Sequence, residues 1–277
     1  MLKKNYAIIG VGAVGGYYGA QLQKIGCNVH YLFHTAQAYQ QALQHGLHVQ
    51  SKTSAFSLPI INAYKRIEDM PRCEVIIVAL KTTQNEHLSD MLPHLVCENT
   101  IILVMQNGLG NEEEIASLIE KHSILCAITT IGAAKNQSGI INVSHDGMVK
   151  LAAYNPSCDI ENVAAIFKLA GVQVELASDH LLIRWQKLLW NIPFNGLSVL
   201  HNMTADKLVK ECASLVNALT SEIISIAQAY DRVISLEYVE QLMSATRAMT
   251  DYKPSMLIDY ERKKPLEIEY LTLRSPC

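Results

Sequence analysis

A glycine-rich turn near the start of the chain restricts the folds that this sequence can adopt. An apolar run over residues 6–9 leads directly into Gly-x-Gly-x-x-Gly, with glycines at Gly10, Gly12 and Gly15. A helical pattern follows as far as Gly26, and a second strand is expected over residues 28–33. Strand, glycine turn, helix and strand in this order are typical of a dinucleotide-binding βαβ unit.

Each glycine of this turn has its own physical reason in such a unit. Gly10 permits the tight turn, Gly12 lets the backbone approach a pyrophosphate, and Gly15 lets the helix pack close to the strand. The N-terminus of the helix then offers N–H groups and a partial positive charge to the phosphates. A glycine turn without a ligand is the alternative, and the flanking strands and helix favour the cofactor.

The composition is that of a globular chain. Its 277 residues, 49% hydrophobic and 18% charged, can form one large or two ordinary domains. The net charge of −3 gives no electrostatic reason to expect nucleic-acid or anionic-membrane binding. No apolar run approaches the roughly 18 residues of a transmembrane helix. Lys3 and Lys4 precede an apolar segment as in a signal peptide, but the first strand already accounts for that segment.

The cysteines and histidines give no pattern of a metal or disulfide site. The seven cysteines are odd in number, scattered and without Cys-x-x-Cys, which favours a reducing cytoplasm over a disulfide framework or zinc site. His30 and His34 are four residues apart, a spacing that suits a metal only on a helix, whereas His30 lies in an expected strand. We therefore expect a cytoplasmic protein without a metal.

The first half of the chain alternates apolar, β-branched runs with helical patterns, which predicts a mostly parallel α/β sheet. The runs at residues 73–80 and 100–105 are almost continuously apolar, as expected of parallel strands buried on both faces. Short strands are expected at residues 47–49 and 56–61, strands that complete this sheet at 123–130, 139–144 and 147–152, and a last strand at 172–176. Helices are expected at residues 34–45, 85–92, 112–121 and 161–169.

Strand signals almost disappear after residue 178. We expect an N-terminal Rossmann-type domain over residues 1–178 and a C-terminal all-helical domain over residues 179–277, with a ligand cleft between them. One apolar stripe at helical spacing predicts core or helix–helix contact: Leu208, Cys212, Leu215, Val216, Leu219, Ile223 and Ile226.

Polar residues follow the expected strands where functional groups of parallel sheets collect. Lys81 comes directly after residues 75–80, and Asn107 with Gly108 follows residues 100–105. A solvated lysine and an ordinary turn dipeptide are the alternatives.

A polar face is expected on one helix of the second half. Lys187, Asn191 and Asn195 lie at intervals of four, with apolar residues at other positions around the helix. Asparagine is a poor helix former, so two of them on a largely apolar helix suggest a function, although a solvated face is the alternative. Pro193 removes a helical N–H and is expected to kink this segment.

Together these segments resemble the ketopantoate reductase (2-dehydropantoate 2-reductase) family over nearly the whole chain. The resemblance implies reduction of 2-dehydropantoate by NADPH to pantoate, for pantothenate and coenzyme A synthesis. It is carried by the glycine turn, Leu80-Lys81, Gln106-Asn107-Gly108-Leu109-Gly110, Trp185-x-Lys187-Leu188-x-x-Asn191-x-x-x-Asn195, Ser255-Met256-Leu257 and Glu267-Ile268-Glu269-Tyr270.

The resemblance also implies roles for residues at matching positions. The glycine turn would hold the pyrophosphate through Gly10, Val11, Gly12, Ala13, Val14 and Gly15. Lys81, Asn107, Ala134 and Glu267 would look onto the cofactor, and Asn107 would also approach the substrate. Lys187 would donate the proton, and Asn191, Asn195 and Ser255 would bind the 2-oxo acid.

These residue types suit the chemistry that the resemblance implies. Hydride delivery to a ketone builds negative charge on oxygen, which a nearby ammonium stabilises and protonates. Burial would lower the pKa of Lys187, while a carboxylate such as Glu267 would hold it up.

Three departures from the family pattern keep alternatives open. His34 stands where a basic residue often faces the 2′-phosphate of NADPH, and no Asp or Glu ends the second strand, so NADPH remains favoured over NADH. Ala205 stands where a further substrate asparagine is expected.

The sequence ends at Cys277, where family members usually add a helical segment, so we expect a less stable helical domain or a homodimer that buries its exposed stripe. A reductase of another small 2-oxo acid and a catalytically degraded nucleotide-binding protein are the alternatives, and the retained Lys187 and Glu267 argue against the second.

Overall fold

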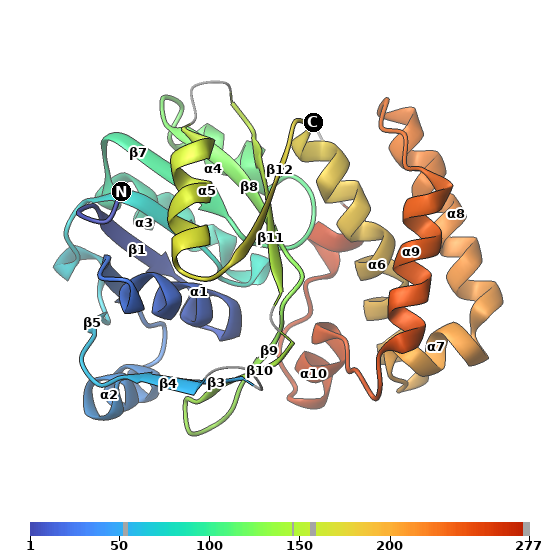
Figure 1. Cartoon of the computed structure of the whole chain (residues 1–277), viewed down its shortest axis with the longest axis horizontal. Coiled ribbons are helices and arrows are strands. Elements are labelled where there is room, and N and C mark those ends of the chain that lie inside the picture. Colours follow the sequence, from blue (N-terminus) through green and yellow to red (C-terminus); the bar gives the residue numbers. More distant parts are fainter. Residues whose placement is uncertain (52–54, 146, 156–158, 274–277) are drawn as a thin grey trace. The chain divides into compact units, whose positions relative to one another are not determined.

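The computed structural model describes residues 1–51, 55–145, 147–155 and 159–273, and the chain forms two compact units (Figure 1). The first unit comprises Met1–Gln106 and Asn111–His180, and the second comprises Asn107–Gly110 and Leu181–Cys277. The short loop Asn107–Gly110, which the sequence analysis placed in the first domain, thus groups with the helical unit.

An eight-stranded sheet forms the centre of the first unit. All neighbouring strands pair in parallel, except that β11 (Met148–Ala153) is antiparallel to β8 (Ser123–Thr129). This confirms the expected mostly parallel sheet. In the order of the sheet the strands are β12 (Gln173–Ala177), β11 (Met148–Ala153), β8 (Ser123–Thr129), β7 (Val96–Val104), β6 (Cys73–Val78), β1 (Asn5–Ile9), β2 (Asn28–Leu32) and β5 (Asn62–Tyr64).

Both faces of this sheet are buried, which explains the continuous apolar runs. Along β1, Tyr6 and Ile8 pack into one hydrophobic cluster, and Ala7 and Ile9 pack into another. This alternation is the two-residue period of a strand. The first cluster is covered by α1 (Ala13–Lys24) and α5 (Ile160–Leu169), which lie in front of the sheet in Figure 1, and the second by α3 (Leu88–Leu95) and α4 (Asn111–Leu118).

A second, four-stranded sheet corrects one prediction. We expected residues 139–144 to complete the large sheet, but this segment forms β10 (Ile141–His145) between β3 (Leu47–Ser51) and β9 (Gly132–Lys135). The remaining strand, β4 (Ala55–Leu58), pairs with β3, which follows α2 (Ala36–His45). Packing explains the difference, because Ile141 lies against Gly16 of α1, where an added Cβ would come within 2.7 Å of the Ile141 side chain.

Helices are the only regular secondary structure among the described residues of the second unit, which confirms the expected fold class. Helix α6 (His180–His201) is continuous and includes Pro193, at which a kink stays a prediction. The elements of the second unit are α6 (His180–His201), α7 (Ala205–Glu211), α8 (Ala213–Ala229), α9 (Leu236–Ala248), α10 (Ser255–Glu261) and a π-helical turn η3 (Glu269–Leu273). Over the described ranges, no helix is long and apolar enough to cross a membrane.

The apolar stripe of the second unit is only partly core. Leu208, Val216 and Ile223 are buried, whereas Leu215 and Ile226 are 46% and 41% exposed. The stripe is split because α7 ends and α8 begins at Cys212, so its residues do not share one continuous helix face.

Candidate functional site

The glycine turn lies where the order of the large sheet reverses. Strand β1 has β2 on one side and β6 on the other, and ligands of open α/β sheets bind at such a switch point. Gly10 has a φ of +96°, and a Cβ there would strike the backbone of Leu80 after β6. A Cβ on Gly15 would strike the carbonyl of Gly10. Packing within the unit therefore accounts for both glycines.

Gly12 differs, because its surroundings leave room for a ligand. Within the described residues, no atom other than its chain neighbours lies within 4 Å of where its Cβ would stand. Gly12 is the N-cap of α1, and in the described structure no side chain caps this helix and its first turn carries no acid. The exposed backbone and uncompensated positive helix end fit a pyrophosphate group.

A buried polar network holds the turn after β6, where Lys81 lies exposed. Gln106 Nε2 donates to the Leu80 carbonyl at 3.1 Å and to Asn85 Oδ1 at 2.6 Å. Asn85 Nδ2 in turn donates to Glu114 Oε2 at 3.1 Å. The sequence did not single out Asn85 or Gln106 for this role, because their partners lie more than 20 residues away.

The end of β2 brings together aromatic and histidine side chains. His34 is exposed, and its ring centroid lies 6.5 Å from that of His87 in the 3₁₀ helix η2 (Thr82–His87). Phe33, directly before His34, is buried.

Lys135 is a residue that the sequence analysis missed. It follows Ala134, which is half-buried in β9, and its Nζ donates to the Val11 carbonyl in the glycine turn at 3.0 Å. The same ammonium lies 5.5 Å from the centroid of the Phe33 ring. Burial lowers the pKa of Lys135 below its ordinary value. The basic residue directly after Ala134 was the available signal, and more than 100 positions separate it from the glycine turn.

In the second unit, Lys187 and Asn191 lie one turn apart on α6. Lys187 is only partly exposed, and burial lowers its pKa to about 8. Its Nζ lies 5.8 Å from the centroid of the Trp190 ring. Loss of hydration is the cause of this shift, which is the effect of burial that we expected from the sequence, and the counteracting effect of Glu267 stays a prediction.

Asn191 is buried and contacts the loop of the second unit that follows β7. Its Nδ2 donates to Asn107 Oδ1 at 3.3 Å. This loop is fixed by Leu109, whose N–H donates to the Tyr270 carbonyl at 2.9 Å. Gly108, with a φ of +95°, allows the close approach, because a Cβ there would strike the same carbonyl.

Asn195 is buried too, and its oxygen is engaged by α10. Oδ1 accepts from the Met256 N–H at 3.1 Å and from Ser255 Oγ at 3.4 Å. Pro254, the N-cap of α10, makes no side-chain cap in the described structure, so Asn195 acts in its place. Ser255 itself is exposed.

Glu267 lies in the segment between α10 and η3, where it is 6% exposed. Tyr270 and Leu271 beside it are also buried, and Leu271 joins Leu109 and Trp185 in one hydrophobic cluster. Glu267 therefore lies in the interior of the second unit, although residues 262–265 before it are exposed.

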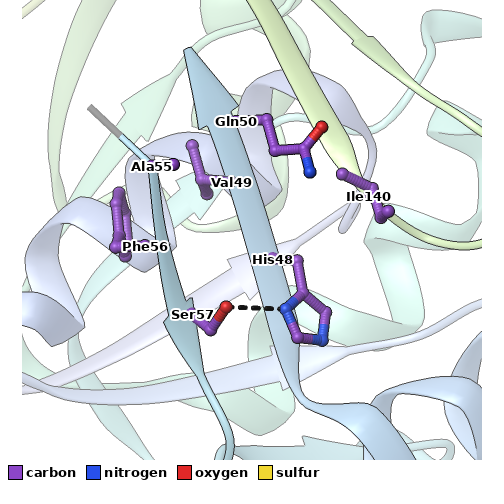
Figure 2. Close-up of a pocket in the computed structure, with 7 residues that line it drawn as sticks. All are labelled: His48, Val49, Gln50, Ala55, Phe56, Ser57 and Ile140. Atoms are coloured by element: carbon purple, nitrogen blue, oxygen red, sulfur yellow. Dashed lines mark hydrogen bonds between the residues drawn. The ribbon is translucent and has the colours of Figure 1, made fainter. Parts of the chain in front are cut away.

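A cavity of about 300 Å³ lies on the small sheet of the first unit (Figure 2). Among its lining residues His48 and Ser57 face each other across β3 and β4, with Nδ1 and Oγ 2.7 Å apart. The predicted site residues do not line this cavity. Among the residues with described positions, no group of three or more His, Cys, Asp or Glu side chains could hold a metal ion.

Comparison with known protein families identifies the chain. The family model "Ketopantoate reductase PanE/ApbA" matches residues 6–156, and "Ketopantoate reductase PanE/ApbA C terminal" matches residues 179–273. The chain belongs to the ketopantoate reductase family. The resemblance found in the sequence is thereby confirmed.

Individual relatives support this membership in the ketopantoate reductases. A 2-dehydropantoate 2-reductase of Nostoc sp. is 40% identical over 278 residues, covering 97% of this chain and 86% of the relative. The crystal structure of 2-dehydropantoate 2-reductase from Geobacter metallireducens has a TM-score of 0.91 at 36% identity, covering 96% of this chain and 90% of that one. The fold is shared by a D-mandelate dehydrogenase solved with NADH and anilino(oxo)acetate, with a TM-score of 0.86 and 21% identity over 96% of this chain and 88% of that one.

Within this ketopantoate reductase fold, the predicted residues form separate groups. In the first unit the glycine turn lies beside the turn that leads to Lys81. In the second unit the structure pairs Asn191 with Asn107 and Asn195 with Ser255. The roles assigned to these residues, and the expected cleft between the domains, stay predictions.

Proposed function

We propose that the protein reduces 2-dehydropantoate to pantoate with NADPH, and that Lys187 is the proton donor. The observation that carries the proposal is a partly buried lysine with a pKa of about 8, one helical turn from the Asn191–Asn107 pair. Membership in the ketopantoate reductase family supports the substrate and the reaction.

Lys187 has two tasks in this reaction. NADPH, when bound, supplies a hydride to the ketone carbon, and negative charge then develops on the carbonyl oxygen. The ammonium of Lys187 stabilises that charge and transfers its proton to the oxygen, which yields the alcohol. A pKa of about 8 suits this role, because the group stays protonated near neutral pH but gives up its proton more readily than an ordinary lysine.

Neutral amides orient the substrate in this proposal. Asn191 and Asn107 offer N–H donors and oxygen acceptors without a charge that would compete with Lys187. Asn195 contributes differently from the sequence expectation, because its oxygen holds the start of α10 and so fixes the position of Ser255. We therefore assign Asn195 a positioning role and Ser255 a place in substrate binding.

Cofactor binding is proposed for the glycine turn, with Lys81, Ala134, Asn107 and Glu267 as further contacts. The open position at Gly12 and the uncapped start of α1 support a bound pyrophosphate. NADPH is preferred over NADH in this proposal because residues 33–35, after β2, are Phe-His-Thr and include no acid to bind a free ribose.

A reductase of another small 2-oxo acid is the second candidate, favoured by Ala205. This residue is fully buried at the start of α7, and its N–H donates to the Tyr252 carbonyl at 2.9 Å. Its methyl group cannot form the hydrogen bond that a substrate asparagine would form.

One assay separates the two candidates. NADPH oxidation is measured with 2-dehydropantoate beside branched, unbranched and aromatic 2-oxo acids, with Lys187→Met as the inactive control. We expect the highest kcat/KM for 2-dehydropantoate and pantoate as the product by mass spectrometry. A higher kcat/KM for another 2-oxo acid would replace the proposed substrate, and no turnover of any 2-oxo acid would refute the reductase function.

A further inference from the structure

Two contacts of Lys135 bear on its function. Its Nζ donates to the carbonyl of Val11, inside the glycine turn, and lies over the ring of Phe33, at the end of β2. The ammonium therefore occupies a point between the turn proposed to hold the pyrophosphate and the end of the second strand. Both contacts arise because β9 is the strand at one edge of the small sheet and packs beside α1.

In dinucleotide-binding folds, the end of the second strand lies beside the adenosine part of the cofactor. The residue that ends the second strand, about 20 residues after the glycine turn, faces the ribose of the adenosine. An acid there binds the free 2′-hydroxyl of NAD, and a cation nearby accommodates the 2′-phosphate of NADP. Phe33 and His34 occupy this position here.

We propose that Lys135 binds the 2′-phosphate of NADPH and is the main determinant of the preference for NADPH over NADH. The inference rests on the proposed function, since it assumes a nicotinamide dinucleotide on the glycine turn. It assigns to a lysine on β9 the selectivity that sequence position alone would assign to His34.

The environment of Lys135 suits a phosphate ligand. A main-chain carbonyl and an aromatic ring face each hold an ammonium in place without neutralising its charge. Burial lowers the pKa of Lys135, so an arriving phosphate dianion restores the preference for the charged form. A charged hydrogen bond formed away from bulk water is stronger than an exposed ion pair.

A structural role is the competing explanation. By bonding to Val11, Lys135 could serve only to fix the glycine turn, and its loss would then weaken every dinucleotide alike. Selectivity separates the two explanations, because NADH differs from NADPH only by the 2′-phosphate. A glutamine at position 135 separates them further, since it retains an N–H donor for the carbonyl but carries no charge.

The test measures dissociation constants by titrating NADPH and NADH against the intact protein, following nucleotide fluorescence. Lys135→Met and Lys135→Gln are both expected to weaken NADPH about 10- to 100-fold and NADH less than about 3-fold. Lys135→Arg keeps the charge and is expected to retain most of the preference. In displacement titrations, Lys135→Met and Lys135→Gln should lower the affinity for 2′,5′-ADP but not for 5′-ADP.

Lys24→Met is the matched control. Lys24 is the last residue of α1, and its ammonium also lies over an aromatic ring, 4.6 Å from the centroid of Phe56. Its removal deletes the same charge and the same type of contact from the same unit, so the NADPH preference should not change.

One result would overturn the inference: an unchanged preference for NADPH over NADH in both the Met and the Gln variant, whether or not both nucleotides bind more weakly. Failure of the proposed function gives a different result. A wild-type protein that binds NADPH selectively but reduces no 2-oxo acid would refute the proposed activity and leave the assignment of Lys135 standing.

Discussion

Replacing Lys187 by methionine should stabilise the second unit while it removes activity. The buried ammonium favours the unfolded chain, where it is fully hydrated, and methionine has a similar length without the charge. The substitution therefore separates the role of Lys187 in catalysis from its effect on stability, with opposite signs expected for the two.

The magnitude follows from the pKa. Burial lowers it from 10.5 to about 8, and each pH unit corresponds to about 1.4 kcal/mol, which gives an upper value of about 3 kcal/mol. Partial exposure of the side chain and loss of its contact with Trp190 reduce the gain, so we expect about 1–2 kcal/mol at pH 7.

The pH dependence has a definite sign. Because the folded pKa is the lower one, the unfolded chain binds more protons between pH 8 and 10.5, and the stability of the wild type rises with pH across this window. The advantage of Lys187→Met should be constant below about pH 8, shrink as pH rises, and disappear above about 10.5. As the pH rises above about 8, the turnover of the wild type should fall because the proton donor loses its proton.

Urea unfolding followed by tryptophan fluorescence measures this effect in the second unit, because both tryptophans of the chain, Trp185 and Trp190, lie on α6. Turnover of Lys187→Met should fall roughly 10²- to 10⁴-fold. Lys207→Met, at an exposed position of α7, is the control and should change stability by less than about 0.5 kcal/mol.

A destabilised Lys187→Met variant at pH 7 would refute this reasoning. That result would mean that a carboxylate such as Glu267 holds the ammonium more strongly than water does. A stability difference that does not vary between pH 8 and 10.5 would equally exclude a lowered pKa.

The other contacts of the second unit give three further predictions. Asn191→Ala should reduce kcat/KM for the 2-oxo acid by an amount that corresponds to about 1–3 kcal/mol of lost transition-state stabilisation. The NADPH dissociation constant should stay unchanged in fluorescence titrations. Asn195→Ala leaves the buried Met256 N–H without its acceptor and should lower the free energy of unfolding by about 1–3 kcal/mol, measured with urea. Gly108→Ala should lower it by more than about 1 kcal/mol, because φ is +95° and the added Cβ would strike the Tyr270 carbonyl.

The sequence predicted the large sheet well because its signal is local. Strands β6 and β7 are buried on both faces, so they appear in the sequence as continuous apolar runs that few other structures would produce. β9 gave no such signal, because Gly-Ala-Ala-Lys is short and weakly apolar. The pairing of β10 with β3 instead of the large sheet depends on Ile141 meeting Gly16, more than 100 residues earlier.

The same distinction applies to the candidate site. The glycine turn and the spacing of Lys187 and Asn191 are patterns within one element, and their sequence positions alone made them candidates. Lys135 became a candidate only when β9 brought it to the Val11 carbonyl. In our proposal a cation contributed by a distant strand takes the place of a basic residue at the end of β2, and position 34 by itself then does not determine which dinucleotide the protein prefers. Selectivity should therefore follow the charge at Lys135 even in a variant whose His34 is exchanged for a basic residue.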